Sequence, residues 1–157
     1  MAAPVLELYR RISQWPAGHW LFSRLVCWKA PYFSSIAPRI EVLEPGRGIA
    51  TIAHRRRVTN HLGTVHAIAL CNLAEFVGGL ACDVSIQASM RWIPKGMTVE
   101  YLRKAMGTMR ATATPAFPPR EASEGYDLPF EVVVENPQGE AVFKATIAMW
   151  VSPKSTR

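Results

Sequence analysis

Residues 64–82 form an almost uninterrupted apolar run, and this run limits the possible folds of the chain more than any other segment. A helix that is apolar nearly all round is either buried inside a protein or spans a membrane. Glu75 lies near the middle of the run, where a carboxylate in lipid would cost about 3 kcal/mol. The run is also barely long enough to cross a bilayer. We therefore predict a helix wrapped by a sheet, without stable membrane insertion.

The size and composition of the chain predict one globular domain over residues 1–157. Apolar residues make up 49% of the 157 residues and charged residues 19%, which provides ample material for a core. The three cysteines show no metal-binding spacing, and an odd number is a poor disulfide framework. We expect a reducing, cytoplasmic compartment, no secretory signal, and neither a metal nor a cofactor.

The remaining segments follow an α+β pattern with an antiparallel sheet. Two helices are predicted at the N-terminus, over residues 5–14 and 18–28. The clearest strand signal is a hairpin of residues 130–134 and 141–151 around Asn136-Pro137-Gln138-Gly139. The other predicted strands cover residues 40–43, 49–58, 86–93 and 98–114, with turns at 44–48 and 94–96.

Glu75 is the most informative residue, because a buried carboxylate must be paired, protonated or functional. A helical wheel places it on one stripe with Ile68, Asn72, Gly79 and Cys82. Gly78 and Gly79 each cost about 1 kcal/mol in a helix relative to alanine, which is explained if something approaches the helix closely there. A structural alternative is an ion pair with an arginine, together with tight packing against the sheet.

The approach to this helix favours a functional interpretation. Residues 59–64 are mostly small or polar and include Gly63, as expected for a helix entrance. Backbone N–H groups at a helix N-terminus point outward with partial positive charge and can hold a developing oxyanion. A carboxylate in the same cavity could serve as general base or nucleophile. His66, taken alone, is expected to be structural.

Residues 60–75, Asn-His-Leu-Gly-Thr-Val-His-Ala-Ile-Ala-Leu-Cys-Asn-Leu-Ala-Glu, resemble the signature of the hotdog-fold acyl-CoA thioesterases of the PaaI type. The chain is still more similar to the DUF4442 branch of that superfamily, which carries a segment like residues 91–101. The motif covers 16 residues, and a looser likeness in strand order covers residues 38–152. The N-terminal helical extension, residues 1–36, lies outside this likeness. Its two helices are expected to cover the core, and the alternative is that they line an acyl tunnel.

The resemblance implies a curved antiparallel sheet wrapped around a central helix, and dimers that join two sheets edge to edge. Glu75 matches the catalytic acidic position, and Asn60 matches the residue that orients water or the thioester. The backbone N–H of Ala67 matches the oxyanion donor, and His66 precedes it as in the family. Where the family has Gly-Gly, this chain has Ala67-Ile68, which leaves less room for a ligand.

A coenzyme A ester would also account for the net charge of +6 and the pI of about 9.6. The phosphate groups of coenzyme A are bound well by arginine and lysine side chains. The candidate phosphate-binding residues are Arg55, Arg56, Arg57, Arg91 and Lys95. Gly63, Asn72 and Gly79 complete the expected substrate-binding set. A solvated strand edge is an equally good explanation of the arginine run.

The sequence thus predicts an acyl-CoA thioesterase, acting as a homodimer or as a tetramer of two dimers. Ala67 and Glu75 lie about 12 Å apart along one helix, so the resemblance to a dimeric family implies sites shared between two chains. A non-catalytic protein that binds acyl-CoA or a lipid is the alternative. A nucleic-acid-binding module has only the charge in its favour, since no zinc finger, RRM signature or long basic run is present, and we expect no nucleic-acid partner.

Overall fold

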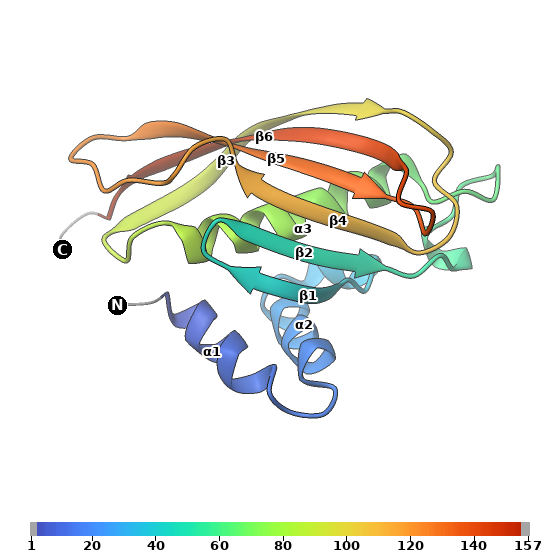
Figure 1. Cartoon of the computed structure of the whole chain (residues 1–157), viewed down its shortest axis with the longest axis horizontal. Coiled ribbons are helices and arrows are strands. Elements are labelled where there is room, and N and C mark those ends of the chain that lie inside the picture. Colours follow the sequence, from blue (N-terminus) through green and yellow to red (C-terminus); the bar gives the residue numbers. More distant parts are fainter. Residues whose placement is uncertain (1–2, 155–157) are drawn as a thin grey trace.

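The computed structural model describes residues 3–154 as one antiparallel sheet of six strands around a central helix. The strand order is β1-β2-β4-β5-β6-β3, and β3 is therefore an edge strand. Figure 1 shows the sheet arching over α3, with α1 and α2 below β1. This arrangement confirms the predicted fold class. The elements are α1 (Pro4–Ile12), α2 (Gly18–Lys29), the 3-10 helix η1 (Pro31–Ser35), β1 (Arg39–Glu44), β2 (Arg47–Ile52), the 3-10 helix η2 (Arg56–Val58), α3 (Ala67–Ser85), β3 (Met90–Tyr101), β4 (Met109–Pro115), β5 (Tyr126–Glu135) and β6 (Ala141–Pro153).

Helix α3 is the core of the molecule. Leu73, Val77 and Ala81 on its sheet-facing side are fully buried. The helix is long and apolar enough to cross a membrane by composition, but 67% of that stretch is buried within the protein. Burial of this extent is typical of the core helix of a soluble protein.

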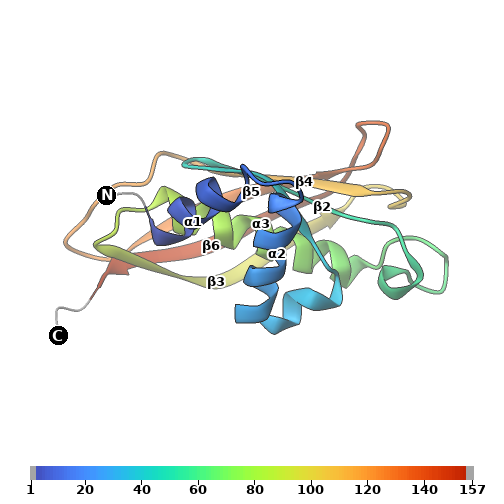
Figure 2. The same cartoon turned by 90° about the horizontal axis from the view of Figure 1, so that it is seen from below.

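The N-terminal helices pack on the side of α3 and β1 that the sheet leaves open (Figure 2). The Tyr9 hydroxyl donates to the carbonyl of Glu41 at 3.0 Å, and the amide of Ile40 donates to Ser23 Oγ at 2.8 Å. Tyr9 and Phe22 also pack edge to face, with ring centroids 5.2 Å apart. These contacts fix both helices to β1.

Several element boundaries differ from the prediction. The strand expected over residues 49–58 ends at Ile52, and the arginine run leads into η2. The segment 98–114 is not one strand: β3 ends at Tyr101 and β4 begins at Met109. The turn expected at 94–96 is a bulge within β3, and an edge strand with a bulge is where a sheet tolerates a proline such as Pro94.

Helix α3 begins at Ala67, three residues later than predicted. Thr59 forms an isolated bridge with Val65, whose amide donates to the carbonyl of Ala105 at 2.9 Å. These bonds hold the chain in extended form until His66. The predicted hairpin, in contrast, is confirmed as β5 and β6, with Asn136 Oδ1 accepting from the amides of Gln138 and Glu140.

Candidate active site

The N-terminus of α3 offers one free backbone donor. His66 is the N-cap, in extended conformation with φ −65° and ψ 139°, and its Nδ1 accepts from the amide of Ile68 at 3.1 Å. The amide of Ala67 donates to no acceptor within residues 3–154. This N–H belongs to the first residue of the helix, where no intrahelical partner exists. It is therefore available to a ligand oxygen.

Asn60 organises the loop that leads to this helix. Its Oδ1 accepts from the amides of Leu62 and Thr64, at 3.0 and 3.2 Å, and its Nδ2 donates to Thr64 Oγ1 at 2.9 Å. Gly63 takes a left-handed conformation, with φ +73°, that favours glycine. Both residues thus shape the loop in front of Ala67, and the side-chain hydrogen bonds of Asn60 are all made within that loop.

A second loop is tied to the first by His54. Its Nδ1 accepts from the amide of Gly107 at 2.9 Å, which leaves the proton on Nε2 to donate to the carbonyl of Gly63, also at 2.9 Å. The segments before α3 and after β3 are thereby joined at one end of the sheet. The sequence did not single out His54, because only the fold brings residues 54, 63 and 107 together.

Glu75 is exposed in the single chain, which corrects the expectation of a buried carboxylate. It forms no ion pair or side-chain hydrogen bond within the described residues, so the alternative of an arginine partner is also wrong for the isolated chain. The predicted stripe around it is divided: Ile68 is 56% exposed, whereas Asn72 and Cys82 are buried. The helical wheel could not reveal that η1 and β3 cover part of that stripe.

The paired glycines are explained by close packing. A Cβ on Gly78 would lie 2.7 Å from Ile147 Cδ1, in the sheet. A Cβ on Gly79 would lie 3.0 Å from Cη2 of Trp92, whose Nε1 donates to Asp83 Oδ1 at 3.1 Å. The sequence correctly indicated a close approach, but the approaching groups are protein side chains. Neither Trp92 nor Asp83 was predicted as part of the site.

Two cavities flank the exposed face of α3. The first, which we call the His66 cavity, has a volume of about 350 Å³ and is bordered by Arg57, Thr59, His66, Ile68 and Asn72, among others. The second, the α2–α3 cavity, has a volume of about 550 Å³, and Glu75 is part of its lining. The start of α3 thus borders a more polar cavity, and Glu75 borders an apolar one.

Asn72 borders the His66 cavity, although its side-chain oxygen is buried. Its Nδ2 donates to Ser35 Oγ at 3.1 Å, but Oδ1 has no hydrogen-bond partner among residues 3–154. An unsatisfied buried acceptor costs about 1–3 kcal/mol, so a ligand N–H that reached it would bind favourably. Contact between Asn72 and substrate stays a prediction, because this oxygen is not exposed to the cavity.

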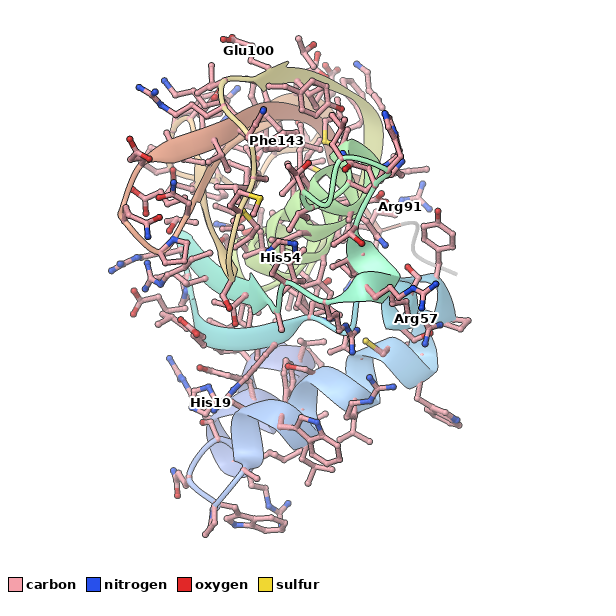
Figure 3. The ribbon with its side chains drawn as sticks, turned by 90° about the vertical axis from the view of Figure 1, so that its right-hand side faces the viewer. His19, His54, Arg57, Arg91, Glu100 and Phe143 are labelled. Atoms are coloured by element: carbon pink, nitrogen blue, oxygen red, sulfur yellow. The ribbon has the colours of Figure 1, made fainter. Side chains whose placement is uncertain are left out.

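The structure separates the predicted phosphate-binding residues. Only Arg57 borders the His66 cavity, and Figure 3 shows it beside the light-blue ribbon of α2 and η1. Arg55 donates from Nη2 to the carbonyl of Ile36 at 3.1 Å, and Arg56 is exposed. Arg91 and Lys95 lie on β3 and bond to Ser152 and Asp127, the latter at 2.7 Å. Neither residue borders the His66 cavity.

Two of the three cysteines are poor candidate nucleophiles. Burial raises the pKa of the Cys82 thiol to about 12 and also raises the pKa of Cys27. A thiol in that state remains protonated at neutral pH and reacts poorly.

Cys71 Sγ lies 3.4 Å from the Tyr101 hydroxyl, and this hydrogen bond is the main reason that the pKa of Tyr101 rises to about 12. Within residues 3–154, no group of three or more His, Cys, Asp or Glu side chains could hold a metal ion.

Comparison with known families agrees with this architecture. The model of a family described as "Domain of unknown function (DUF4442)" matches residues 18–151, a range that includes α2 as well as the sheet. The chain belongs to the DUF4442 family. No curated protein matches it significantly.

Solved structures extend the comparison. A structural-genomics crystal structure designated APC5556 is 44% identical, covers 96% of this chain and 99% of its own, and has a TM-score of 0.81. PA5026 from Pseudomonas aeruginosa, a protein of unknown function described as a probable thioesterase, is 25% identical with a TM-score of 0.73, over 84% of this chain and 93% of its own. Thioesterase HI1161 from Haemophilus influenzae is 17% identical with a TM-score of 0.67, over 78% of this chain and 82% of its own. This DUF4442 chain thus has the hotdog fold and resembles thioesterases.

Proposed function

We propose that the protein hydrolyses acyl-CoA thioesters, with the Ala67 N–H as oxyanion donor and Glu75 as general base or nucleophile. The observation that carries the proposal is that one helix holds both groups. Within residues 3–154, the Ala67 N–H donates to no acceptor, and the exposed Glu75 carboxylate has no partner. The donor would stabilise the negative charge that develops on the thioester oxygen. With Glu75 as base, water adds to the carbonyl carbon, the C–S bond breaks, and the CoA thiolate takes up the proton.

This mechanism requires two chains. Ala67 and Glu75 are separated by about 12 Å along α3, so one carbonyl group cannot reach both within a single chain. β3 is an unpaired edge strand of 12 residues, and the neighbouring face of α3 leaves the apolar Ile68 exposed. Pairing of two β3 edges about a two-fold axis would cover these surfaces and bring Ala67 of one chain near Glu75 of the other. We propose such a homodimer, which a tetramer of two dimers could contain, in a reducing compartment such as the cytoplasm.

The direct test is a panel of acyl-CoA esters assayed with a thiol-detecting reagent. The proposal expects release of free CoA that depends on enzyme concentration and saturates with substrate. Ile68 is the specific observation in favour of a binding protein without turnover, because its exposed side chain stands where the resembled thioesterases carry glycine. Tight acyl-CoA binding without thiol release across the panel would establish that alternative and refute hydrolysis.

Arg57 gives a more local prediction. Replacing Arg57 with serine should raise KM for acyl-CoA roughly two- to fivefold at low salt, as expected for one exposed charge pair. The value of kcat should change little, because contacts to a remote phosphate act equally on ground and transition states. The effect should fade in high salt. Arg56→Ser, a neighbouring exposed arginine outside the His66 cavity, is the matched control and should leave KM unchanged. Equal effects of both variants would mean that only general charge matters.

A further inference from the structure

The α2–α3 cavity is the larger of the two cavities beside the proposed site, and it is formed largely by the N-terminal helices. Leu8 of α1 and Leu25 and Val26 of α2 form one side, and Phe76 and Leu80 of α3 form another. Leu8 and Leu25 are 44% and 39% exposed, although they line a concave apolar surface. A volume of about 550 Å³ lies within the range typical of small-molecule sites.

Trp92 forms another wall of the cavity, and a hydrogen bond to Asp83 holds it in place. Trp92 lies against Gly79, where the Cβ of a larger residue would lie only 3.0 Å from Cη2 of the indole ring. The hydrogen bond from Trp92 Nε1 to Asp83 Oδ1 fixes the plane of that ring. This contact keeps the cavity open and well defined, because the indole ring is held in place and Gly79 has no side chain that could fill the space.

The position of the cavity relative to Glu75 indicates what it would hold. Glu75 is part of its lining, whereas His66 and Arg57 border the other cavity, at the N-terminal end of α3. If two α3 helices run antiparallel across a two-fold axis, the His66 cavity of one chain lies next to the α2–α3 cavity of its partner. A thioester between Ala67 of one chain and Glu75 of the other would then extend into both cavities.

We propose that the α2–α3 cavity binds the aliphatic acyl chain of the substrate, while the CoA portion lies along the His66 cavity of the other chain. This inference rests on the proposed function, and it assigns α1 and α2 a role in specificity beyond covering the core. The cavity wall is mostly apolar, so it favours hydrocarbon over polar acyl groups. Each methylene that it buries should tighten binding about fourfold.

Binding of S-alkyl-CoA thioethers tests this assignment without any need for turnover. Calorimetric titration of the wild-type protein should show octyl-CoA binding more tightly than butyl-CoA by about 10²-fold, because four more methylenes are buried. Leu25→Trp fills the cavity from α2 and should weaken octyl-CoA binding at least about tenfold, while butyl-CoA binding changes less than about twofold. Phe117→Trp, which adds the same side chain at an exposed position outside the cavity, should change neither.

The outcomes separate the two proposals. Equal affinity of the wild-type protein for octyl-CoA and butyl-CoA would overturn the acyl-chain assignment, even if thioesters are hydrolysed. The same conclusion would follow if Leu25→Trp, shown to be folded by circular dichroism, bound octyl-CoA as the wild type does. Absence of thiol release from every acyl-CoA would refute hydrolysis alone, because the thioether titrations measure the cavity directly.

Discussion

Replacing Ala67 with proline is expected to lower kcat for thioester hydrolysis by about 10²- to 10³-fold, the usual effect of losing one oxyanion donor. Proline lacks the backbone N–H, so the substitution removes the donor and leaves the other proposed catalytic groups in place. The measurement is kcat on the best acyl-CoA of the panel, with the melting temperature of each variant as a check on folding.

The local backbone makes this substitution structurally mild. Ala67 is the first residue of α3, the helical position at which proline is most common. His66 before it already has the extended conformation, φ −65° and ψ 139°, that a following proline requires. Ala67→Gly keeps the N–H and is the matched control, with activity retained. If Ala67→Pro is folded and as active as Ala67→Gly, the amide of residue 67 does not take part in catalysis.

Glu75→Gln should reduce kcat by about 10²-fold or more, the usual contribution of a general base. Glutamine keeps the shape of the side chain and removes its basicity. Because Glu75 is exposed and unpaired among the described residues, the free energy of unfolding should change by no more than about 0.5 kcal/mol. A loss of activity in this variant can therefore be distinguished from a loss of stability, which would be difficult for a buried carboxylate.

The matched control is Glu124→Gln, at an exposed loop position that borders neither cavity. It should leave both kcat and stability unchanged. A Glu75→Gln protein that unfolds would instead show that the carboxylate is structural. A folded and fully active Glu75→Gln protein would remove Glu75 from the mechanism.

The sequence was most informative where a local pattern determines the structure. The apolar run around Glu75 predicted a core helix, because a membrane span would place its carboxylate in lipid, and the turn at Asn136 predicted a hairpin. The segment between β3 and β4 had no such pattern. Its loop is set by distant partners, such as the carbonyl of Val142, which accepts from the amides of Leu102 and Arg103, and His54, which accepts from Gly107.

The candidate site was predictable in part for the same reason. The amide of Ala67 was singled out by the family resemblance together with the chemistry of a helix N-terminus, whereas the hydrogen bonds of Asn60 within its own loop were not predicted. The sequence could not show that Glu75 faces solvent in a single chain, because this depends on where the sheet edge lies. Trp92 could have been noticed as an aromatic side chain beside the proline of an edge strand, but its contact with Gly79 is purely tertiary.

The most direct test of the account is a subunit-mixing experiment with Ala67→Pro and Glu75→Gln. Each variant alone should be nearly inactive. In a mixed dimer one site would carry both substitutions and the other neither, so random pairing of equal amounts after joint refolding should restore roughly a quarter of the wild-type sites. A mixture of Glu75→Gln with Glu75→Ala should restore none. If mixed dimers of Ala67→Pro and Glu75→Gln form, as seen with subunits of different mass, and activity does not return, then the two groups do not share a site across chains.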